Sequence, residues 1–303
     1  MKRVGFVGCE AWLKHTGSAD FFVKLLKNDF EVKTFSEPKW VMKGNAPINE
    51  LNKAKLDAIV FWYILPPARY LAKLECKNII WVPMWDGQNG LLLSIIKSVF
   101  YKAFNLKVIC FSKKCRDLLS PFFNCRYYQY FPKPLKQVKL DKPRLLFWER
   151  RENLNYHFIS KNLINENDFD SITVKQTIDI GTSSKIINPK IKVINKWLAK
   201  REYEKVLSKH NVFIAPRLKE GIGFSFLEAL QRGYCVIANN DSTMNEYIKD
   251  NETGILFNYS KPENLNINKE LIKRIGTNTS QFMKKGYLKW NKQKRDLLKW
   301  ILN

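Results

Sequence analysis

Short apolar runs alternate with helix-like stretches along the whole chain, and this alternation restricts the fold more than any other feature. The expected strands of the first half are rich in Val, Ile and aromatic residues and continuously apolar, as parallel strands buried on both faces must be. They are expected at Arg3–Val7, Glu31–Phe35, Ala58–Ile64, Asn78–Pro83, Lys107–Phe111 and Tyr127–Phe131. Amphipathic helices are expected between them, at Ala19–Lys27 and Leu91–Phe104 among others. The pattern predicts an α/β protein with a doubly wound parallel sheet.

A linker-like segment indicates a second domain of the same kind. Residues 133–144 combine prolines and lysines with little apolar pattern. The alternation then restarts, with strands expected at Arg144–Trp148, Ser171–Lys175, Lys192–Ile194, Asn211–Ala215, Tyr234–Ala238 and Gly254–Phe257. A length of 303 residues suits two domains. We therefore expect domains at residues 1–138 and 139–267, a helical tail at 268–303 and a ligand cleft between the two sheets.

The positive charge of the chain is unevenly distributed. There are 52 basic and 28 acidic residues, which gives a net charge of +24 at pH 7. Residues 1–140 carry a net +13, residues 141–267 only +3, and the tail from 268 carries +8. Such an excess favours an anionic partner, which can be nucleic acid, an anionic membrane surface or a phosphorylated substrate. A lysine-rich chain that charge merely keeps soluble is the alternative.

The cysteines and the apolar runs argue against several classes of protein. Six cysteines occur without a Cys-x-x-Cys pair, which is typical of reduced thiols in the cytoplasm and not of a disulfide framework or a zinc site. Apolar runs fall short of the roughly 18 residues of a membrane span, and the N-terminal run lacks a signal-peptide cleavage site. Without metal-ligand spacing among His, Glu and Cys, we expect neither a metal nor a cofactor.

The segment 212–256 carries the richest chemical pattern. A buried strand ends at Pro216, the sequence Glu-Gly-Ile-Gly follows at 220–223, and a helix is expected from Phe224 to near Gly233. The N–H groups at the start of this helix suit a phosphate. Glu220 at the end of the strand and Glu228 in the helix can accept hydrogen bonds from sugar hydroxyls. A phosphate flanked by two hydroxyl-rich groups describes a nucleotide sugar.

This compound pattern resembles the retaining GT-B glycosyltransferases of family 4. The order strand, Pro, Glu-Gly-x-Gly, Glu-Ala-Leu, Gly, Val-Ile-Ala, Asn-Glu-x-Ile and Glu-Thr-Gly-Ile-Leu covers residues 210–257. The hallmark of the family is E-x7-E, which Glu220 and Glu228 form here. Shorter similarities occur at 110–119 and 130–135. The resemblance implies a GT-B fold, with two Rossmann-like domains facing a cleft, and sugar transfer with retention at the anomeric carbon.

The resemblance also implies roles for individual residues of the second domain. Glu220 would contact the donor sugar near the reacting carbon, and Glu228 would bind the ribose hydroxyls of the donor. The other implied donor-binding residues are Gly221, Ile222, Gly223 and Phe224, which would face the diphosphate, and Asn240 and Thr243, which would line the other side of the pocket.

The family neutralises the leaving diphosphate with an arginine and a lysine near the start of this domain. Arg150 aligns with the arginine, after Glu149 in place of the family's glycine, but the lysine position falls on Asn155. The missing charge has three candidate sources: Arg151, Lys175 and Arg217. An ordinary surface role for Arg150 is the alternative. In this design arginine and the helix dipole take the place of a metal ion.

In the first domain the resemblance implies a binding site for the acceptor. Gly17, in the loop His15–Ala19, would offer N–H groups to the phosphate. Asp86 follows the fourth strand and can orient or deprotonate an acceptor hydroxyl, or it can simply form an Asp-Gly turn. Of the aromatic residues nearby, Trp62 and Trp81 are expected in the core.

Taken together, the sequence predicts a metal-independent, hexosyltransferase-type enzyme. It would move a sugar from a nucleoside diphosphate sugar to an acceptor hydroxyl in the assembly of bacterial lipopolysaccharide or capsule. The basic first domain and tail favour a glycan or lipid-linked acceptor and a peripheral location on the inner face of the cytoplasmic membrane. Three alternatives are a nucleic-acid binder, although the chain lacks a nucleic-acid motif, an inactive homologue that binds nucleotide sugar, and a transferase with a soluble acceptor.

Overall fold

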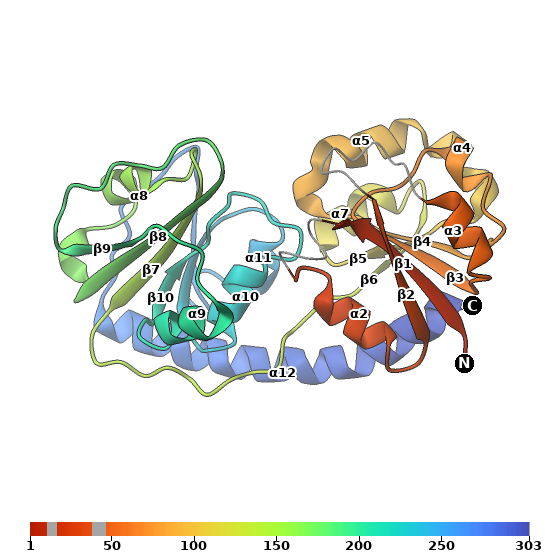
Figure 1. Cartoon of the computed structure of the whole chain (residues 1–303). Helices are drawn as coiled ribbons and strands as arrows, with labels where there is room; N and C mark the ends of the chain where they lie inside the picture. Colours follow the sequence, from red (N-terminus) through yellow and green to blue (C-terminus); the bar gives the residue numbers. More distant parts are fainter. Residues whose placement is uncertain (11–16, 38–46, 303) are drawn as a thin grey trace. The chain divides into compact units, whose positions relative to one another are not determined.

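The computed structural model describes residues 1–10, 17–37 and 47–302. The chain forms two compact units, each with its own parallel sheet (Figure 1). Unit 1 comprises Met1–Tyr130 and Lys289–Asn303, and unit 2 comprises Phe131–Leu288.

In the described part of unit 1, six parallel strands form a sheet in the order β2-β1-β3-β4-β5-β6. Their bounds are β1 Arg3–Cys9, β2 Glu31–Glu37, β3 Ala58–Trp62, β4 Ile79–Val82, β5 Lys107–Cys110 and β6 Asn124–Tyr127. Every residue of β3, β4 and β5 is buried, as their continuous apolar runs predict. The strand order reverses between β1 and β3, which is the switch point of this sheet.

The sixth strand lies earlier in the chain than the sequence predicts. It was expected at Tyr127–Phe131, but β6 ends at Tyr127. β6 is the edge strand, and its residues alternate between exposed and half-buried. It therefore has no continuous apolar run, and the apolar residues Tyr128 and Phe131 are buried in the segment that follows it. The other strands of both units fall on the predicted segments.

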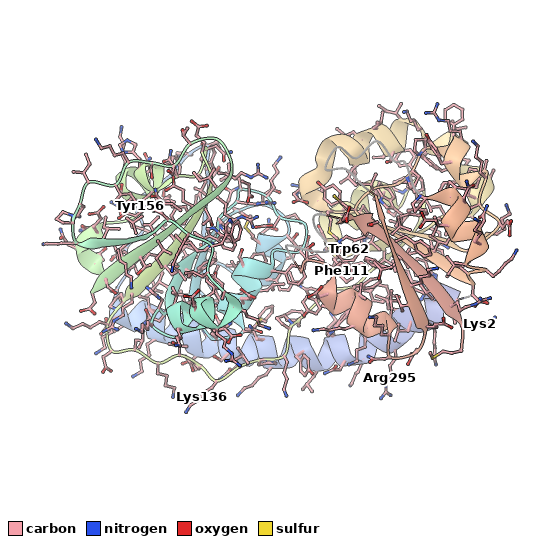
Figure 2. The ribbon with its side chains drawn as sticks, in the orientation of Figure 1. Lys2, Trp62, Phe111, Lys136, Tyr156 and Arg295 are labelled. Atoms are coloured by element: carbon pink, nitrogen blue, oxygen red, sulfur yellow. The ribbon has the colours of Figure 1, made fainter. Side chains whose placement is uncertain are left out.

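Helices pack on both faces of the unit 1 sheet. They are α2 Asp20–Leu26, α3 Ile48–Lys53, α4 Ala68–Leu71, α5 Gln88–Ile96, α6 Ser98–Tyr101 and α7 Lys113–Leu119, with 3-10 turns at Trp85–Gly87 and Lys102–Phe104. On one face, the ring of Phe22 in α2 lies 5.5 Å from that of Trp62 and 5.8 Å from that of Phe111. Trp62 and Phe111 are neighbours in Figure 2. Trp62 and Trp81 are both buried, which confirms their assignment to the core.

In unit 2, six described strands form a parallel sheet in the order β12-β11-β10-β7-β8-β9. The strands are β7 Arg144–Arg151, β8 Ser171–Ile180, β9 Ile191–Ile194, β10 Val212–Ile214, β11 Cys235–Asn239 and β12 Ile255–Phe257. The helices are α8 Tyr156–Asn162, α9 Lys200–Leu207, α10 Phe224–Leu230 and α11 Met244–Tyr247, with a 3-10 turn at Glu166–Asp168. The strand order reverses between β7 and β10, so this sheet has its switch point there.

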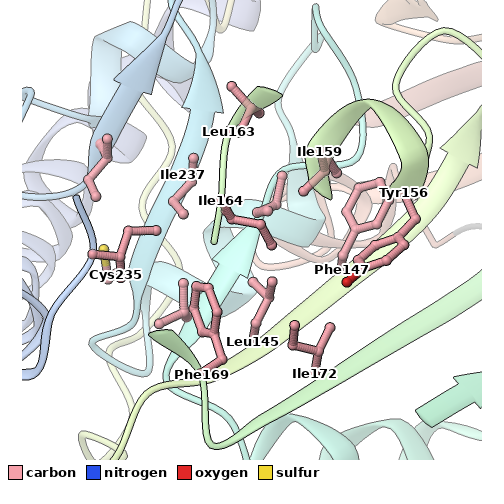
Figure 3. Close-up of a cluster of buried hydrophobic side chains, with 14 of the residues drawn as sticks. Leu145, Phe147, Tyr156, Ile159, Leu163, Ile164, Phe169, Ile172, Cys235 and Ile237 are labelled. Atoms are coloured by element: carbon pink, nitrogen blue, oxygen red, sulfur yellow. The ribbon is translucent and has the colours of Figure 1, made fainter. Parts of the chain in front are cut away.

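An apolar cluster on one face of the unit 2 sheet holds β7, β10 and β11 against α8 (Figure 3). Leu145, Phe147, Ile159 and Ile237 are fully buried within it. Burial of each such side chain stabilises the fold by about 1.5–3 kcal/mol. Among these strands only β7 carries charged side chains, and they lie at its two ends, Arg144 at the start and Glu149, Arg150 and Arg151 at the carboxyl end.

The long helix α12, Lys269–Leu302, contributes to both units, because its residues from Lys289 onward belong to unit 1. There Trp290, Leu297 and Ile301 are buried. The side chain of Asn78 donates a 2.6 Å hydrogen bond to the carbonyl of Ile301, near the end of the helix. The apolar stripe of the tail is therefore covered, whereas its lysines at 284, 285, 289 and 292 are exposed.

In unit 2, α12 approaches the end of α10 through small residues. Gly233 has φ +70°, and a Cβ there would lie 2.4 Å from Ser280 Oγ and 3.1 Å from the carbonyl of Gly276 on α12. Only glycine fits both the conformation and the space. Among the described residues, no helix is both long enough and apolar enough to cross a bilayer.

Candidate functional site

Two arginines share one carboxylate at the switch point of unit 2. Arg150, at the end of β7, places Nη2 2.9 Å from Oδ2 of Asp179 on β8, and Arg217, just after β10, places its Nη2 2.8 Å from the same oxygen. Arg151 Nε lies 3.7 Å away. Burial disfavours the charged form of Asp179, but the charges of Arg150 and Arg217 outweigh it and lower the pKa of this carboxyl.

This cluster has a surplus of positive charge. Three guanidinium groups surround a single carboxylate. The side chains of Arg150, Arg217 and Asp179 are each about one fifth exposed, so solvent and ligands reach them. Guanidinium groups bind phosphates with paired N–H donors. The structure thus brings Arg150 together with two of the three residues that the sequence offered in place of the missing lysine.

The third of those residues, Lys175, has a different environment. Its Nζ lies 3.6 Å from the ring centre of Trp148 and 4.4 Å from that of Trp197, and it donates a 2.6 Å hydrogen bond to Thr177 Oγ1. Burial, with the nearby charge of Arg150, lowers the pKa of Lys175 to about 7. Lys175 is therefore packed among aromatic rings, as cation–π contacts favour, and is only partly charged at neutral pH.

Glu149, which stands where the family has a glycine, is a fully buried carboxylate with four hydrogen bonds. It accepts from Ser184 N at 2.6 Å and Ser184 Oγ at 2.7 Å, and more weakly from the side chain of Gln176 and the N–H of Tyr156. A buried charge is tolerated only with such partners. Glu149 thus fixes the segment after β8 and the start of α8. Asn155 caps that helix, because its side chain accepts from Phe158 N at 2.8 Å.

The loop with Glu220 is tied to the loop after β11. Thr243 is fully buried, and its hydroxyl lies 2.7 Å from the carbonyl oxygen of Glu220 and 2.6 Å from that of Gly221. The N–H of Glu220 donates to the carbonyl of Ser242. Glu220 itself is 7% exposed. This arrangement gives Thr243 a positioning function for the loop, and its predicted contact with a donor stays a prediction.

The remaining loop residues adopt the expected local geometry. Gly223 precedes α10 with φ +79°, and a Cβ there would overlap the ring of Phe226. Gly221 and Ile222 are buried, and Phe224, the first residue of α10, is half-buried. On the other side, Asn240 is exposed and its side-chain oxygen accepts from Asn245 at 3.1 Å. The predicted donor contacts of these residues stay predictions.

Glu228 lies in a pocket of about 300 Å³ between α9, α10 and the segment after residue 131. The pocket is lined by Lys133, Leu135, Lys200, Tyr203, Glu204, Leu207, Glu228, Gln231 and Arg232. Burial raises the pKa of Glu228, although the charges of Arg232 and Lys200 oppose it.

Tyr203 connects this pocket to the arginine cluster. Burial raises the pKa of Tyr203, the charge of Glu228 raises it further, and the charge of Arg150 opposes the shift, so both groups lie within its electrostatic reach. Its hydroxyl is buried without a hydrogen-bond partner among the described residues. A ligand with hydroxyl groups can satisfy it.

In unit 1 the two predicted residues lie in turns, Gly17 directly before α2 and Asp86 after β4. Gly17, with φ +59°, accepts at its carbonyl from Asp20 N in the turn before α2. His15 and Thr16, in the same predicted loop, lie outside the described residues. Asp86 lies in the 3-10 turn after β4 and is half-buried, directly after the buried Trp85. The predicted roles of both residues stay predictions.

The sequence analysis missed Asp179, the carboxylate at the centre of the arginine cluster. The strand was expected to end at Lys175, but β8 continues to Ile180. Thr173, Lys175, Thr177 and Asp179 alternate along it, so they share one face. This alternation of polar residues at every second position predicts a strand that continues past Lys175. It also predicts that one face of the strand, opposite the apolar cluster, is polar.

Comparison with known proteins places this geometry in context. Residues 183–285 match the family model of the glycosyl transferases group 1. No sequence among the curated proteins matches the chain.

Solved structures resemble the whole chain. Sucrose-phosphate synthase from Thermosynechococcus elongatus superposes with a TM-score of 0.68 at 13% identity, over 98% of this chain and 99% of that one. Anabaena HepE, solved in complex with UDP and glucose, gives 0.64 at 10% identity, over 99% and 100%. WaaG, described as a glycosyltransferase involved in lipopolysaccharide biosynthesis, gives 0.53 at 12% identity, over 98% and 95%. At such identities the likeness shows a shared fold, the α/β GT-B fold with two Rossmann-like halves, which confirms the predicted fold class.

Proposed function

We propose that this GT-B protein, whose fold and group 1 match support a glycosyltransferase, moves a sugar from a nucleoside diphosphate sugar to an acceptor hydroxyl with retention. The observation that carries the proposal is the pairing of Arg150 and Arg217 on Asp179 at the switch point of unit 2, next to the loop that holds Glu220. A diphosphate is the anion that suits two guanidinium groups with one shared carboxylate.

Each group has a role in this reaction. Arg150 and Arg217 stabilise the negative charge that develops on the leaving diphosphate, as preorganised donors do. Glu220 faces the donor sugar near the reacting carbon, held there by Thr243 through the backbone of the loop. Glu228 accepts hydrogen bonds from the ribose hydroxyls, and its partly desolvated carboxylate strengthens them. Asp86 in unit 1 orients the acceptor hydroxyl.

The donor carries a nucleoside diphosphate, and we propose UDP as the first to test because UDP and UDP-glucose complexes occur among the similar structures. The arginine cluster can neutralise the negative charge of the diphosphate without a metal ion, so we propose a metal-independent transfer. The acceptor is a glycan or a lipid-linked intermediate of surface polysaccharide assembly, in keeping with the similarity to WaaG. We place the enzyme on the cytoplasmic face of the membrane because of its charge of +24.

A donor screen tests the proposal. Thermal unfolding of the protein is followed with UDP, GDP, dTDP and CMP, and one nucleotide at ten times its dissociation constant is expected to add about 1.4 kcal/mol of stability. The matching nucleotide sugars are then assayed for slow hydrolysis and for transfer to short acceptors. Stabilisation by one nucleotide and release of its sugar support the proposal. Indifference to all four nucleotides at millimolar concentration would contradict it.

A further inference from the structure

The segment of unit 1 that holds α5 and α6 carries apolar side chains on both sides. The sequence predicts an amphipathic helix at Leu91–Phe104, and the helical part of this prediction is confirmed, but the amphipathic part is wrong. Leu91, Ile95 and Tyr101 face the core of unit 1. Large apolar side chains on the outer side of a helix, in addition to those that face the core, are not typical of an ordinary water-facing surface.

The outward side chains form the apolar surface of α5–α6. Their exposed fractions are 52% for Leu92, 50% for Leu93, 76% for Ile96, 61% for Val99 and 65% for Phe100. Single exposed apolar residues are common in proteins, but a contiguous group marks a site of interaction with a protein or a membrane. Figure 1 shows that α5 lies along the rim of unit 1.

The charge of this segment selects between those two partners. Residues 87–116 contain six basic residues, of which Lys107 is buried, and no acidic residue. Lys97 lies between α5 and α6, Lys102 directly follows α6, and both are exposed. Large apolar side chains flanked by lysines suit the boundary between the headgroups and acyl chains of an anionic bilayer. A second copy of this chain would instead bring the same positive charge to the contact.

The C-terminal tail does not offer an equivalent surface. Trp290, Leu297 and Ile301 of the tail are buried in unit 1, and beside its exposed lysines a single large apolar side chain of its described residues, Leu288, is mostly exposed, at 65%. The tail can attract an anionic surface over a distance of about 8 Å in physiological salt. Of these two surfaces, the apolar surface of α5–α6 is the one that combines this attraction with several large side chains that can enter the bilayer.

We infer that the apolar surface of α5–α6 inserts into the interfacial layer of an anionic lipid bilayer and docks unit 1 there. Such docking would bring the enzyme to a lipid-linked acceptor, so the inference rests on the proposed function. The apolar side chains hold the protein in the bilayer. Lys97, Lys102 and the lysines of the tail add an electrostatic attraction to the anionic lipids, which salt weakens.

The test compares two double variants of the full chain by flotation with vesicles. Ile96→Ser/Phe100→Ser removes two side chains of the surface, and Ile187→Ser/Leu288→Ser removes two with matched exposed fractions of 81% and 65% from unit 2. The vesicles are phosphatidylcholine with or without phosphatidylglycerol. Wild type and the unit 2 variant are expected to float with the anionic vesicles. The α5–α6 variant should bind about 100-fold more weakly, from about tenfold for each large side chain removed.

Two results would overturn the inference. One is flotation of the α5–α6 variant equal to that of wild type. The other is failure of wild type to float at low salt, together with a wild-type dimer that this variant dissociates, which would assign the surface to self-association. Hydrolysis of the donor is measured without lipid in the same preparations. If the α5–α6 variant loses vesicle binding but still hydrolyses the donor, its defect is one of membrane docking and not of catalysis. If wild type binds vesicles but does not hydrolyse the donor, the proposed function is contradicted and the docking inference is not.

Discussion

Two segments of the chain, 1–140 and 141–267, use positive charge in different ways. Residues 1–140 hold most of the net charge, and their exposed lysines, such as Lys97 and Lys102, lie on the outer surface. The segment 141–267 is almost neutral, yet it concentrates Arg150 and Arg217 at one point of its sheet. The position of charge within the fold, and not net charge alone, therefore indicates where a small anion binds.

The carboxyl ends of the two sheets differ in the same sense. In unit 1, Trp62 ends β3 and Phe111 follows β5, and both are packed in an aromatic cluster. In unit 2, the ends of β7 and β8 carry charged groups held by hydrogen bonds and ion pairs, among them the buried Glu149 and the carboxylate of Asp179. The first arrangement stabilises the unit, whereas the second is preorganised for a charged ligand.

The largest effect is expected from Glu220→Gln, which should leave the fold intact and lower turnover by about 30- to 1000-fold. A contact made only in the transition state is worth about 2–4 kcal/mol. The control is Glu252→Gln, which removes an exposed carboxylate of unit 2 that pairs with Lys249. The constants kcat and KM are measured with matched donor and acceptor. Turnover of the Glu220 variant within threefold of wild type would contradict the proposed contact between Glu220 and the reacting sugar.

Removal of one arginine from the cluster sharpens the contrast between focused and diffuse charge. Arg217→Met is expected to weaken binding of the nucleoside diphosphate by about 10- to 100-fold, because a hydrogen bond to a charged group contributes about 1.5–3 kcal/mol. Lys97→Met, which removes an exposed charge of unit 1, is the control and should leave this affinity unchanged. Calorimetric titration of both variants decides between them. Equal losses in the two variants would mean that only net charge matters.

Lys175 makes the stability of unit 2 depend on pH. Its pKa in the folded protein is about 7, below the ordinary value of 10.5, so between these values the unfolded chain binds the additional proton. Stability should therefore rise with pH from about 7 to 10, by up to about 1.4 kcal/mol per pH unit. Denaturant unfolding of wild type and Lys175→Met across this range measures the difference. Parallel pH profiles for the two proteins would show that Lys175 keeps its ordinary pKa.

A smaller effect is expected from Glu228→Ala. Because a ribose contact is equally strong in the ground and transition states, the variant should raise KM for the donor by about three- to tenfold with little change in kcat. Glu252→Ala, which removes an exposed carboxylate of unit 2 outside this pocket, is the control. Unchanged constants in the Glu228 variant would make this side chain an ordinary helix charge.

Regular elements of the fold were predictable because buried parallel strands leave continuous apolar runs. β3, β4 and β5 show this, and the edge strand β6 was misplaced because exposure removes the run. The loop at 220–223 was predictable from its glycines. The partners of the arginines were not predictable. Asp179 pairs with Arg150 and Arg217 only because the strands β7, β8 and β10 meet at the switch point. Such a meeting is a property of topology and not of local sequence.

The outward apolar surface of α5–α6 was also hidden from the sequence. The sequence predicts an amphipathic helix at Leu91–Phe104, but the element is apolar on both sides and the core covers only one of them. Which side is covered depends on how α5 lies on the sheet, and that depends on residues far away in the chain.

The central claim is that the switch point of unit 2 binds the nucleoside diphosphate. Amide hydrogen exchange resolved by peptide, with and without the nucleotide that stabilises the protein most, tests this claim most directly. The account predicts slower exchange in the segments 217–224 and 239–243, with the exposed segment of α5–α6 unchanged. Protection confined to unit 1, or none at a concentration that saturates the protein, would contradict it.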